Sequence, residues 1–373
     1  MSNISCAAPW RGLHINPRGD VKTCCAGDPN MLGNLNTQTI EEILHGPVLQ
    51  EIRQTVRSGQ LHEKYCYNCI QAERYGRSER DWHNNVSPEF DPQTATDREH
   101  LPALIDVRWN TTCNLSCNYC APACSSKWAD LKGIPVKSGA RPYYEQVCDY
   151  LEQHQTSIRE VALVGGEPLL LPENVRLLDV VPASATITLI TNASVDLESN
   201  KIFKKLATRQ RVGWSLSFDN TGSCFEYVRN GASWTKLLHN LDAIQNLMHE
   251  QGHTGGIHAV YNVYNATRLV EFTEFARARG LSIQWQSLYQ PECLDPQRLG
   301  PKIIQLAQQE QERLLDSGLC LPAEEEFFKC ISFNASTEDL TTQLYQHVLE
   351  IEQYHPEQQG KFVELWPEIS NLL

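Results

Sequence analysis

The stretch from Ala103 to Cys120, ALIDVRWNTTCNLSCNYC, joins an apolar run directly to a group of cysteines. The apolar run at residues 103–109 predicts a buried β-strand. The loop after it carries Cys113, Cys117 and Cys120 in the spacing Cys-x3-Cys-x2-Cys, so three thiols converge from one short loop. Structural zinc sites usually take four ligands, supplied as two separated pairs, and this loop does not have that spacing. A four-iron cluster usually takes four thiolates, one for each iron. Three thiolates leave one iron open to another ligand, with Cys124 as the alternative fourth ligand.

Strands and helices alternate from this stretch onward. A helix with an apolar stripe is expected from Trp234 to Met248, and another at residues 267–279, where Gly280 suits the C-terminal cap. Six strand–helix repeats predict an α/β fold, an open partial (β/α)6 parallel barrel with right-handed crossovers. In such folds ligands bind at the carboxyl ends of the strands. The candidate strands are residues 103–109, 159–164, 186–191, 212–218, 257–263 and 282–286.

Residues 1–75 predict a small separate module. Residues 12–16 and 20–24 are expected to pair as a β-hairpin, and residues 39–44 and 48–56 to form short helices. This segment offers little apolar material for independent folding, so a bound metal centre would help to hold it.

The remaining boundaries follow from composition. Residues 76–102 predict a polar linker, in which Ser87-Pro88 and Asp91-Pro92 disfavour helix. Residues 103–300 are expected to form the barrel, and the Gln- and Glu-rich residues 301–373 a helical C-terminal tail packed on it.

Composition and charge exclude several classes of protein. Of 373 residues, 41% are hydrophobic and 21% charged, as in folded proteins, and no apolar run of about 18 residues predicts a membrane span. The first residues carry no basic region followed by an apolar stretch, so we expect no signal peptide and a cytoplasmic location. A net charge of −13 disfavours nucleic acid as a partner. Fourteen cysteines in a cytosolic chain indicate metal or redox chemistry rather than disulfides.

The cysteine spacing at the end of the first strand resembles the radical S-adenosylmethionine (SAM) superfamily. Later segments agree in order over about residues 103–290. Gly165-Gly166-Glu167-Pro168 looks like the family's GGEP motif and Thr191-Asn192 like its TN segment. Ser215-Leu-Ser217-Phe-Asp219 resembles S-x-D, and Arg229-Asn-Gly231 resembles R-x-G.

The resemblance implies that Cys113, Cys117 and Cys120 hold a [4Fe–4S] cluster whose open iron binds SAM. It makes Glu167 the candidate catalytic residue, pairing with the SAM ammonium group. The implied SAM-binding residues are Tyr119, Gly165, Gly166, Glu167, Asn192, Ser217, Asp219 and Arg229.

Plainer roles compete with these assignments. Ser217 and Asp219 are also suited to capping strand ends. Asn192 suits a left-handed turn, Arg229 a surface ion pair, and Tyr119 packing beside the cluster.

The N-terminal cysteines resemble the auxiliary-cluster pattern of SPASM and twitch domains, in which a Gly-x4-Cys segment follows a first cysteine and precedes a Cys-x2-Cys pair. In those families the module usually follows the barrel, whereas here it precedes it. The alternatives are Cys25 in place of Cys24, and a structural zinc site in place of the cluster. The resemblance implies an auxiliary [4Fe–4S] cluster, the second of two, with the ligands Cys6, Cys24, Cys66 and Cys69.

These features predict a radical SAM enzyme. It is expected to cleave SAM reductively to a 5′-deoxyadenosyl radical that abstracts hydrogen from a substrate, with an electron donor such as flavodoxin or ferredoxin. A peptide or protein is the first expectation for the substrate, because auxiliary-cluster members often modify peptides; a small molecule such as a sugar or alcohol is the competitor. The alternative from another class is a non-enzymatic zinc or iron–sulfur scaffold, which leaves the GGEP-like and S-x-D-like segments unexplained.

Overall fold

The computed structural model describes residues 5–27, 30–73, 78–97, 100–136, 142–288, 290–333 and 339–373. Within these residues the predicted barrel strands form one parallel series, each paired with the next along the chain. The α/β partial-barrel prediction is therefore confirmed. The strands are β4 (Leu104–Val107), β6 (Glu160–Leu163), β7 (Thr186–Thr191), β8 (Val212–Ser217), β10 (Thr254–Tyr261) and β11 (Ile283–Ser287).

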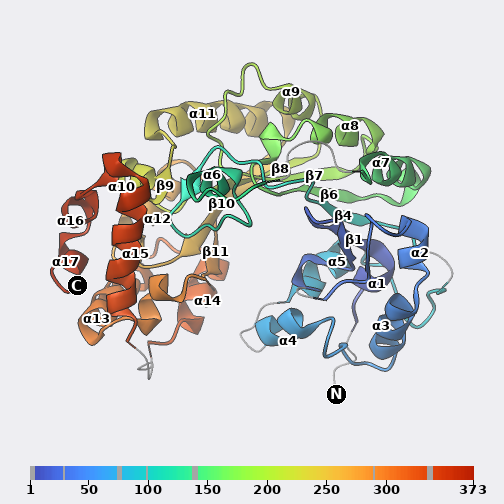
Figure 1. The fold of residues 1–373 in the computed structure, drawn as a ribbon, viewed down its shortest axis with the longest axis horizontal. Coiled ribbons are helices and arrows are strands. Elements are labelled where there is room, and N and C mark those ends of the chain that lie inside the picture. Colours follow the sequence, from blue (N-terminus) through green and yellow to red (C-terminus); the bar gives the residue numbers. More distant parts are fainter. Residues whose placement is uncertain are drawn as a thin grey trace.

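Helices cover one face of this sheet, because alternate strand residues are apolar. In β7, Ile187 and Leu189 are buried in the main core, while Thr188 between them is partly exposed. Figure 1 shows α7, α8, α9 and α11 along this side. The predicted stripe lies on α11, and Gly280 follows α12 with a φ of +66°. The helices between strands are α6 (Ser126–Leu131), α7 (Tyr144–Gln153), α8 (Glu173–Val180), α9 (Lys201–Ala207), α10 (Gly222–Val228), α11 (Trp234–Gln251) and α12 (Leu269–Ala278).

The N-terminal strands extend the barrel sheet. The predicted hairpin is confirmed as β1 (Gly12–Ile15) paired antiparallel with β2 (Asp20–Lys22), followed by β3 (Gly33–Asn34). β1 also pairs in parallel with β4, so the described sheet has the order β11-β10-β8-β7-β6-β4-β1-β2-β3. Leu13 and Ile15 consequently belong to the same core as the barrel.

Short helices complete the N-terminal part, and the two predicted ones are confirmed as α2 and α3. The capping box at Thr39 and Glu42 explains where α2 starts. The helices are α1 (Ala8–Arg11), α2 (Ile40–Leu44), α3 (Pro47–Arg57) and α4 (Tyr67–Glu73).

The expectation that the linker lacks helix is wrong for its first part, where α5 (Glu79–Val86) lies. The Ser87-Pro88 pair disfavours helix only at the residue before proline, so it ends α5 without preventing it. The Trp82 Nε1–H donates to Glu160 Oε1 over 3.1 Å, and this bond docks α5 at the start of β6.

The C-terminal region is helical, as predicted, and lies at the end of the sheet opposite the N-terminal elements (Figure 1). The Ile283 N–H donates to Glu324 Oε1 over 2.7 Å, which joins α14 to the edge strand β11. No described helix is long and apolar enough to cross a membrane. The helices are α13 (Pro301–Asp316), α14 (Pro322–Cys330), α15 (Thr341–Tyr354), α16 (Lys361–Leu365) and α17 (Pro367–Ser370).

Candidate functional site

The cysteine loop after β4 is held by a short two-stranded ladder. β5 (Ser116–Cys117) pairs antiparallel with β9 (Arg229–Asn230), which places Cys117 directly opposite Arg229. The Cys120 N–H donates to the Cys117 carbonyl over 2.9 Å and closes the second turn of the loop. Burial and the neighbouring Cys117 raise the pKa of Cys113 to about 12, and the pKa of Cys120 is raised for the same reasons. The structure thus brings the three predicted cluster thiols together.

The GGEP-like segment after β6 packs on the beginning of this loop. The Glu167 N–H donates to the Thr112 carbonyl over 2.8 Å. A Cβ on Gly166 would lie 2.2 Å from that carbonyl oxygen, so only glycine fits there. Gly165 has a φ of +135°, which side chains rarely allow. Both glycines therefore permit close contact between two segments of this chain's own backbone.

Glu167 is completely buried and joins the ends of β6 and β7. Its Oε1 accepts from the Leu169 N–H at 3.1 Å and from the Thr191 hydroxyl at 2.7 Å, and its Oε2 accepts from the Asn192 N–H at 2.8 Å. Burial raises the pKa of Glu167 to about 7, although these hydrogen bonds oppose the shift. In this structure the Glu167 carboxylate holds the ends of β6 and β7 together through these hydrogen bonds. Its contact with the ammonium group of SAM stays a prediction.

Asn192 lies beside the first cluster cysteine. Its Nδ2 donates to Asn114 Oδ1 at 3.1 Å and reaches Cys113 Sγ at 3.9 Å, while its Oδ1 accepts from the Ser194 hydroxyl at 2.6 Å. The left-handed residue of this turn is Ala193, with a φ of +49°, and not Asn192. The turn alternative is therefore wrong for Asn192.

The buried residues Asp219 and Arg229 form one group with the partly buried Tyr119 against the cluster loop. Asp219 Oδ2 accepts from Arg229 Nη2 at 2.9 Å, from Arg229 Nε at 3.2 Å and from the Tyr119 hydroxyl at 2.6 Å. The Arg229 guanidinium carbon lies 5.5 Å from the centre of the Tyr119 ring. The alternative of a surface ion pair is wrong for Arg229, because the pair is buried. Ser217 lies at the end of β8, opposite His258 of β10.

Sequence reasoning missed the contacts that the C-terminal helices make with the cluster loop. His347 on α15 lies with its Nε2 2.9 Å from the Asn118 carbonyl oxygen, and His355 Nε2 lies 3.1 Å from the Ser116 hydroxyl. The Trp128 Nε1–H donates to the Cys117 carbonyl at 2.9 Å. The histidine partners are more than 200 positions away in the sequence, and no local pattern reveals such a pairing.

The N-terminal cysteines meet around one cavity. Burial raises the pKa of Cys6 to about 12 and that of Cys69 to about 11. Four sulfur donors around one cavity suit a four-iron cluster, which usually takes four thiolates. No group of three or more His, Cys, Asp or Glu in the described residues is arranged to hold a single metal ion. The cysteines that line the cavity are Cys6, Cys24, Cys66 and Cys69.

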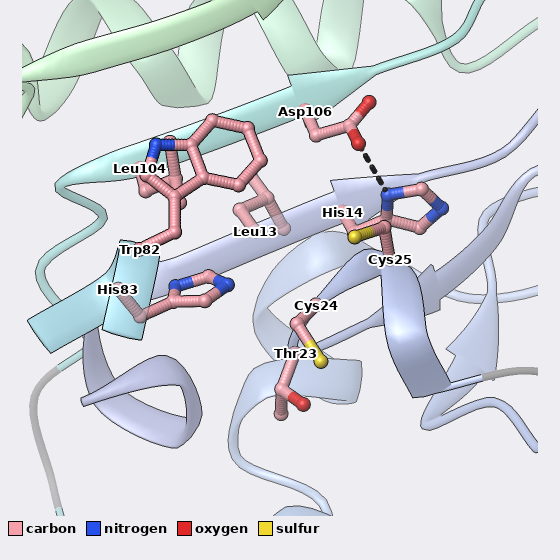
Figure 2. Close-up of a pocket in the computed structure, with 9 residues that line it drawn as sticks. All are labelled: Leu13, His14, Thr23, Cys24, Cys25, Trp82, His83, Leu104 and Asp106. Carbon is pink, nitrogen blue, oxygen red and sulfur yellow. Dashed lines mark ion pairs between the residues drawn. The ribbon is translucent and has the colours of Figure 1, made fainter. Parts of the chain in front are cut away.

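Cys25 faces a different, adjoining cavity (Figure 2). Figure 2 shows the sulfur atoms of Cys24 and Cys25 pointing in different directions, with Cys25 on the side of His14. In that cavity His14 Nδ1 lies 3.0 Å from Asp106 Oδ2, across the β1–β4 pairing. Burial alone would raise the pKa of Asp106, but Arg108 and His14 hold it well below its usual range. The structure therefore groups Cys24, rather than Cys25, with the other three cysteines.

Comparison with known proteins matches two stretches, each a quarter of the chain or less. Residues 6–70 match the family model described as SPASM, an iron–sulfur cluster-binding domain. A stretch of 94 residues is 35% identical to 7-carboxy-7-deazaguanine synthase of Clostridium acetobutylicum, over 25% of this chain and 38% of that protein. The chain thus matches well under half of that relative's length.

Solved structures give weaker likenesses. Native anSMEcpe with bound AdoMet is 18% identical with a TM-score of 0.40, over 58% of each chain. SuiB of Streptococcus suis bound to S-adenosylmethionine is 13% identical with a TM-score of 0.43, over 83% of this chain and 70% of that one. The family match assigns a SPASM iron–sulfur cluster-binding domain to residues 6–70. The parallel partial barrel and the cysteine loop after β4 have the arrangement that the radical SAM resemblance predicts.

Proposed function

We propose that this chain is a radical SAM enzyme that abstracts hydrogen from a peptide or protein substrate. When bound, a [4Fe–4S] cluster and SAM supply an electron and a 5′-deoxyadenosyl radical. The observation that carries the proposal is the placement of the three loop thiols at the carboxyl ends of the parallel strands. The β5–β9 ladder holds Cys117 there, and the Glu167 N–H bond to Thr112 fixes the start of the loop.

In that reaction the residues of this chain bind the cluster and SAM and orient them. Cys113, Cys117 and Cys120 hold the cluster and leave one position for SAM. Glu167 orients the strand ends around the SAM amino group and contacts it. The remaining proposed SAM contacts come from the backbone of Gly165 and Gly166 and from the side chains of Tyr119, Asn192, Ser217 and Asp219.

The auxiliary centre is held by the four cysteines of the N-terminal cavity, Cys6, Cys24, Cys66 and Cys69. These four residues would fill all protein positions of a cluster bound there, which would supply electron transfer or support for the fold rather than a direct substrate site. A donor protein such as flavodoxin or ferredoxin supplies the electron. The residue boundaries of the auxiliary module, linker, barrel and tail are part of the same proposal.

The substrate is polar in this proposal. The sheet face opposite the buried Leu189 and Leu216 presents the polar Ser215 and Ser217, which are partly exposed, beside Thr188 and Ile190 of β7. A peptide offers backbone groups that can pair with such a surface. A small molecule is the second candidate, because the 35% identical stretch belongs to a protein named for a deazaguanine product.

Anaerobic reconstitution tests the proposal. The full chain is expected to bind roughly eight irons, the content of two four-iron clusters, and to form 5′-deoxyadenosine from SAM when a strong reductant is added. Zinc together with only four irons would contradict the auxiliary cluster. Bound iron without any cleavage of SAM would favour the non-enzymatic scaffold.

A further inference from the structure

Arg229 is placed to act on the loop cluster rather than on SAM. We propose that Arg229, held by Asp219 and Tyr119, sets the reduction potential of that cluster through Cys117. This inference rests on the proposed function, since it requires a cluster on the loop cysteines. It replaces a SAM-binding role for Arg229 by a positioning and electrostatic one.

The contact itself is the first argument. Arg229 and Cys117 are cross-strand neighbours in the β5–β9 ladder, and Arg229 Nη1 reaches Cys117 Sγ at 3.9 Å. The Arg229 side chain is only 7% exposed, so solvent screens its charge little. Asn192 makes a similar contact, Nδ2 to Sγ at 3.9 Å, with Cys113. Two of the three loop sulfurs therefore lie against an N–H donor of this chain.

The edge of Arg229 that suits a carboxylate is already occupied by Asp219. Arginine binds carboxylates best through two N–H groups along one edge. In this chain Nε and Nη2 both donate to Asp219 Oδ2, and the Tyr119 hydroxyl donates to the same oxygen. The other carboxylate oxygen accepts from the Val260 N–H at 2.6 Å. A SAM carboxylate would have to displace a fully buried partner, whereas the Nη1 contact with sulfur needs no rearrangement.

Charge then gives the direction of the effect. Hydrogen bonds to the sulfurs and nearby charge set the potentials of iron–sulfur clusters. Reduction adds an electron, so the Arg229 charge favours the reduced cluster and the Asp219 charge opposes it. Removing the cation should lower the potential, and removing the anion should raise it. Mere loss of packing has no reason to produce opposite signs, since both changes break the same ion pair.

The test is a redox titration of the reconstituted full chain followed by electron paramagnetic resonance, without SAM. The loop-cluster signal is the one that is missing when Cys113, Cys117 and Cys120 are replaced by Ala. We compare the parent with R229Q, R229K and D219N. The matched control is R176Q, which removes the same charge from an exposed residue on α8.

At the parent's midpoint, the ratio of oxidised to reduced loop cluster is expected to rise about tenfold in R229Q, a shift of about 59 mV for one electron. D219N should shift in the opposite direction, R229K should stay nearer to the parent than R229Q does, and R176Q should not shift. If R229Q binds no loop cluster, the test rests on D219N alone. A potential above the parent's supports the inference, and a potential at or below the parent's contradicts it.

Either of two kinds of result would overturn the inference. One is an unchanged potential in both R229Q and D219N, or shifts of the same sign. The other is an R229Q protein with the parent's potential but weakened SAM binding, which would restore Arg229 as a SAM ligand. A parent protein without any loop cluster is a different failure, because it removes the proposed function and this inference together.

Discussion

Replacing Gly166 by Ala should separate the GGEP-like segment from the cluster loop. The new Cβ would lie 2.2 Å from the Thr112 carbonyl oxygen, whereas ordinary contacts begin at 3.4 Å, so the two segments must part by about 1 Å. The Glu167 N–H bond to Thr112, 2.8 Å long, is then stretched or lost. Forced overpacking and a lost hydrogen bond together cost about 2–4 kcal/mol. That is a large part of the roughly 5–15 kcal/mol that stabilises a typical folded protein.

Urea unfolding of the metal-free chain measures this loss, and iron content after reconstitution measures its effect on the loop. Gly213→Ala is the matched control, because a Cβ there meets only ordinary contacts, the nearest at 3.5 Å from the Thr254 hydroxyl. We expect this control to match or slightly exceed the parent's stability. If Gly166→Ala unfolds within about 0.5 kcal/mol of the control and binds as much iron, the close packing inferred here is refuted.

Three further changes test other parts of the site. Replacing both Cys66 and Cys69 by Ala should remove roughly four irons and reduce product formation far more than SAM cleavage. Circular dichroism checks that the variant is folded, and full product formation by the folded variant would exclude a catalytic role for the auxiliary cluster. Glu167→Ala should weaken SAM binding roughly tenfold or more by loss of a charge-assisted contact, as followed by a spectral titration of the cluster; equal affinity would remove Glu167 from the SAM site. His347→Phe should lower the free energy of unfolding by about 0.5–1.5 kcal/mol, because the bond to the Asn118 carbonyl is lost; an unchanged urea midpoint would show that α15 does not help to hold the loop.

Elements with strong local signals were predictable from the sequence. The β7 strand begins and ends where it was predicted, and α11 covers the predicted apolar stripe. Both were predictable because the spacing of apolar residues in a strand or helix depends only on residues close together in the sequence. The hairpin of β1 and β2 likewise follows from its turn sequence. The three loop cysteines come together for a similar reason, since one short segment carries all of them.

Long-range pairings were not predictable in this way. The parallel pairing of His14 in β1 with Asp106 in β4 joins residues about 90 positions apart. The residue pattern of neither strand indicates which strand lies beside it. The same holds for the contact of Arg229 with Cys117. Arg229 stood out in the sequence only through a motif that implied SAM, and its buried pairing with Asp219 became visible only in three dimensions.

The most direct test of the central claim is the formation of 5′-deoxyadenosine by the reconstituted chain, with and without the three loop thiols. The parent protein should cleave SAM under strong reductant. A variant with Cys113, Cys117 and Cys120 replaced by Ala should form none, while its auxiliary cluster still binds roughly four irons. Cleavage in the triple variant at the parent's rate would contradict the assignment of the cysteine loop as the site of SAM chemistry.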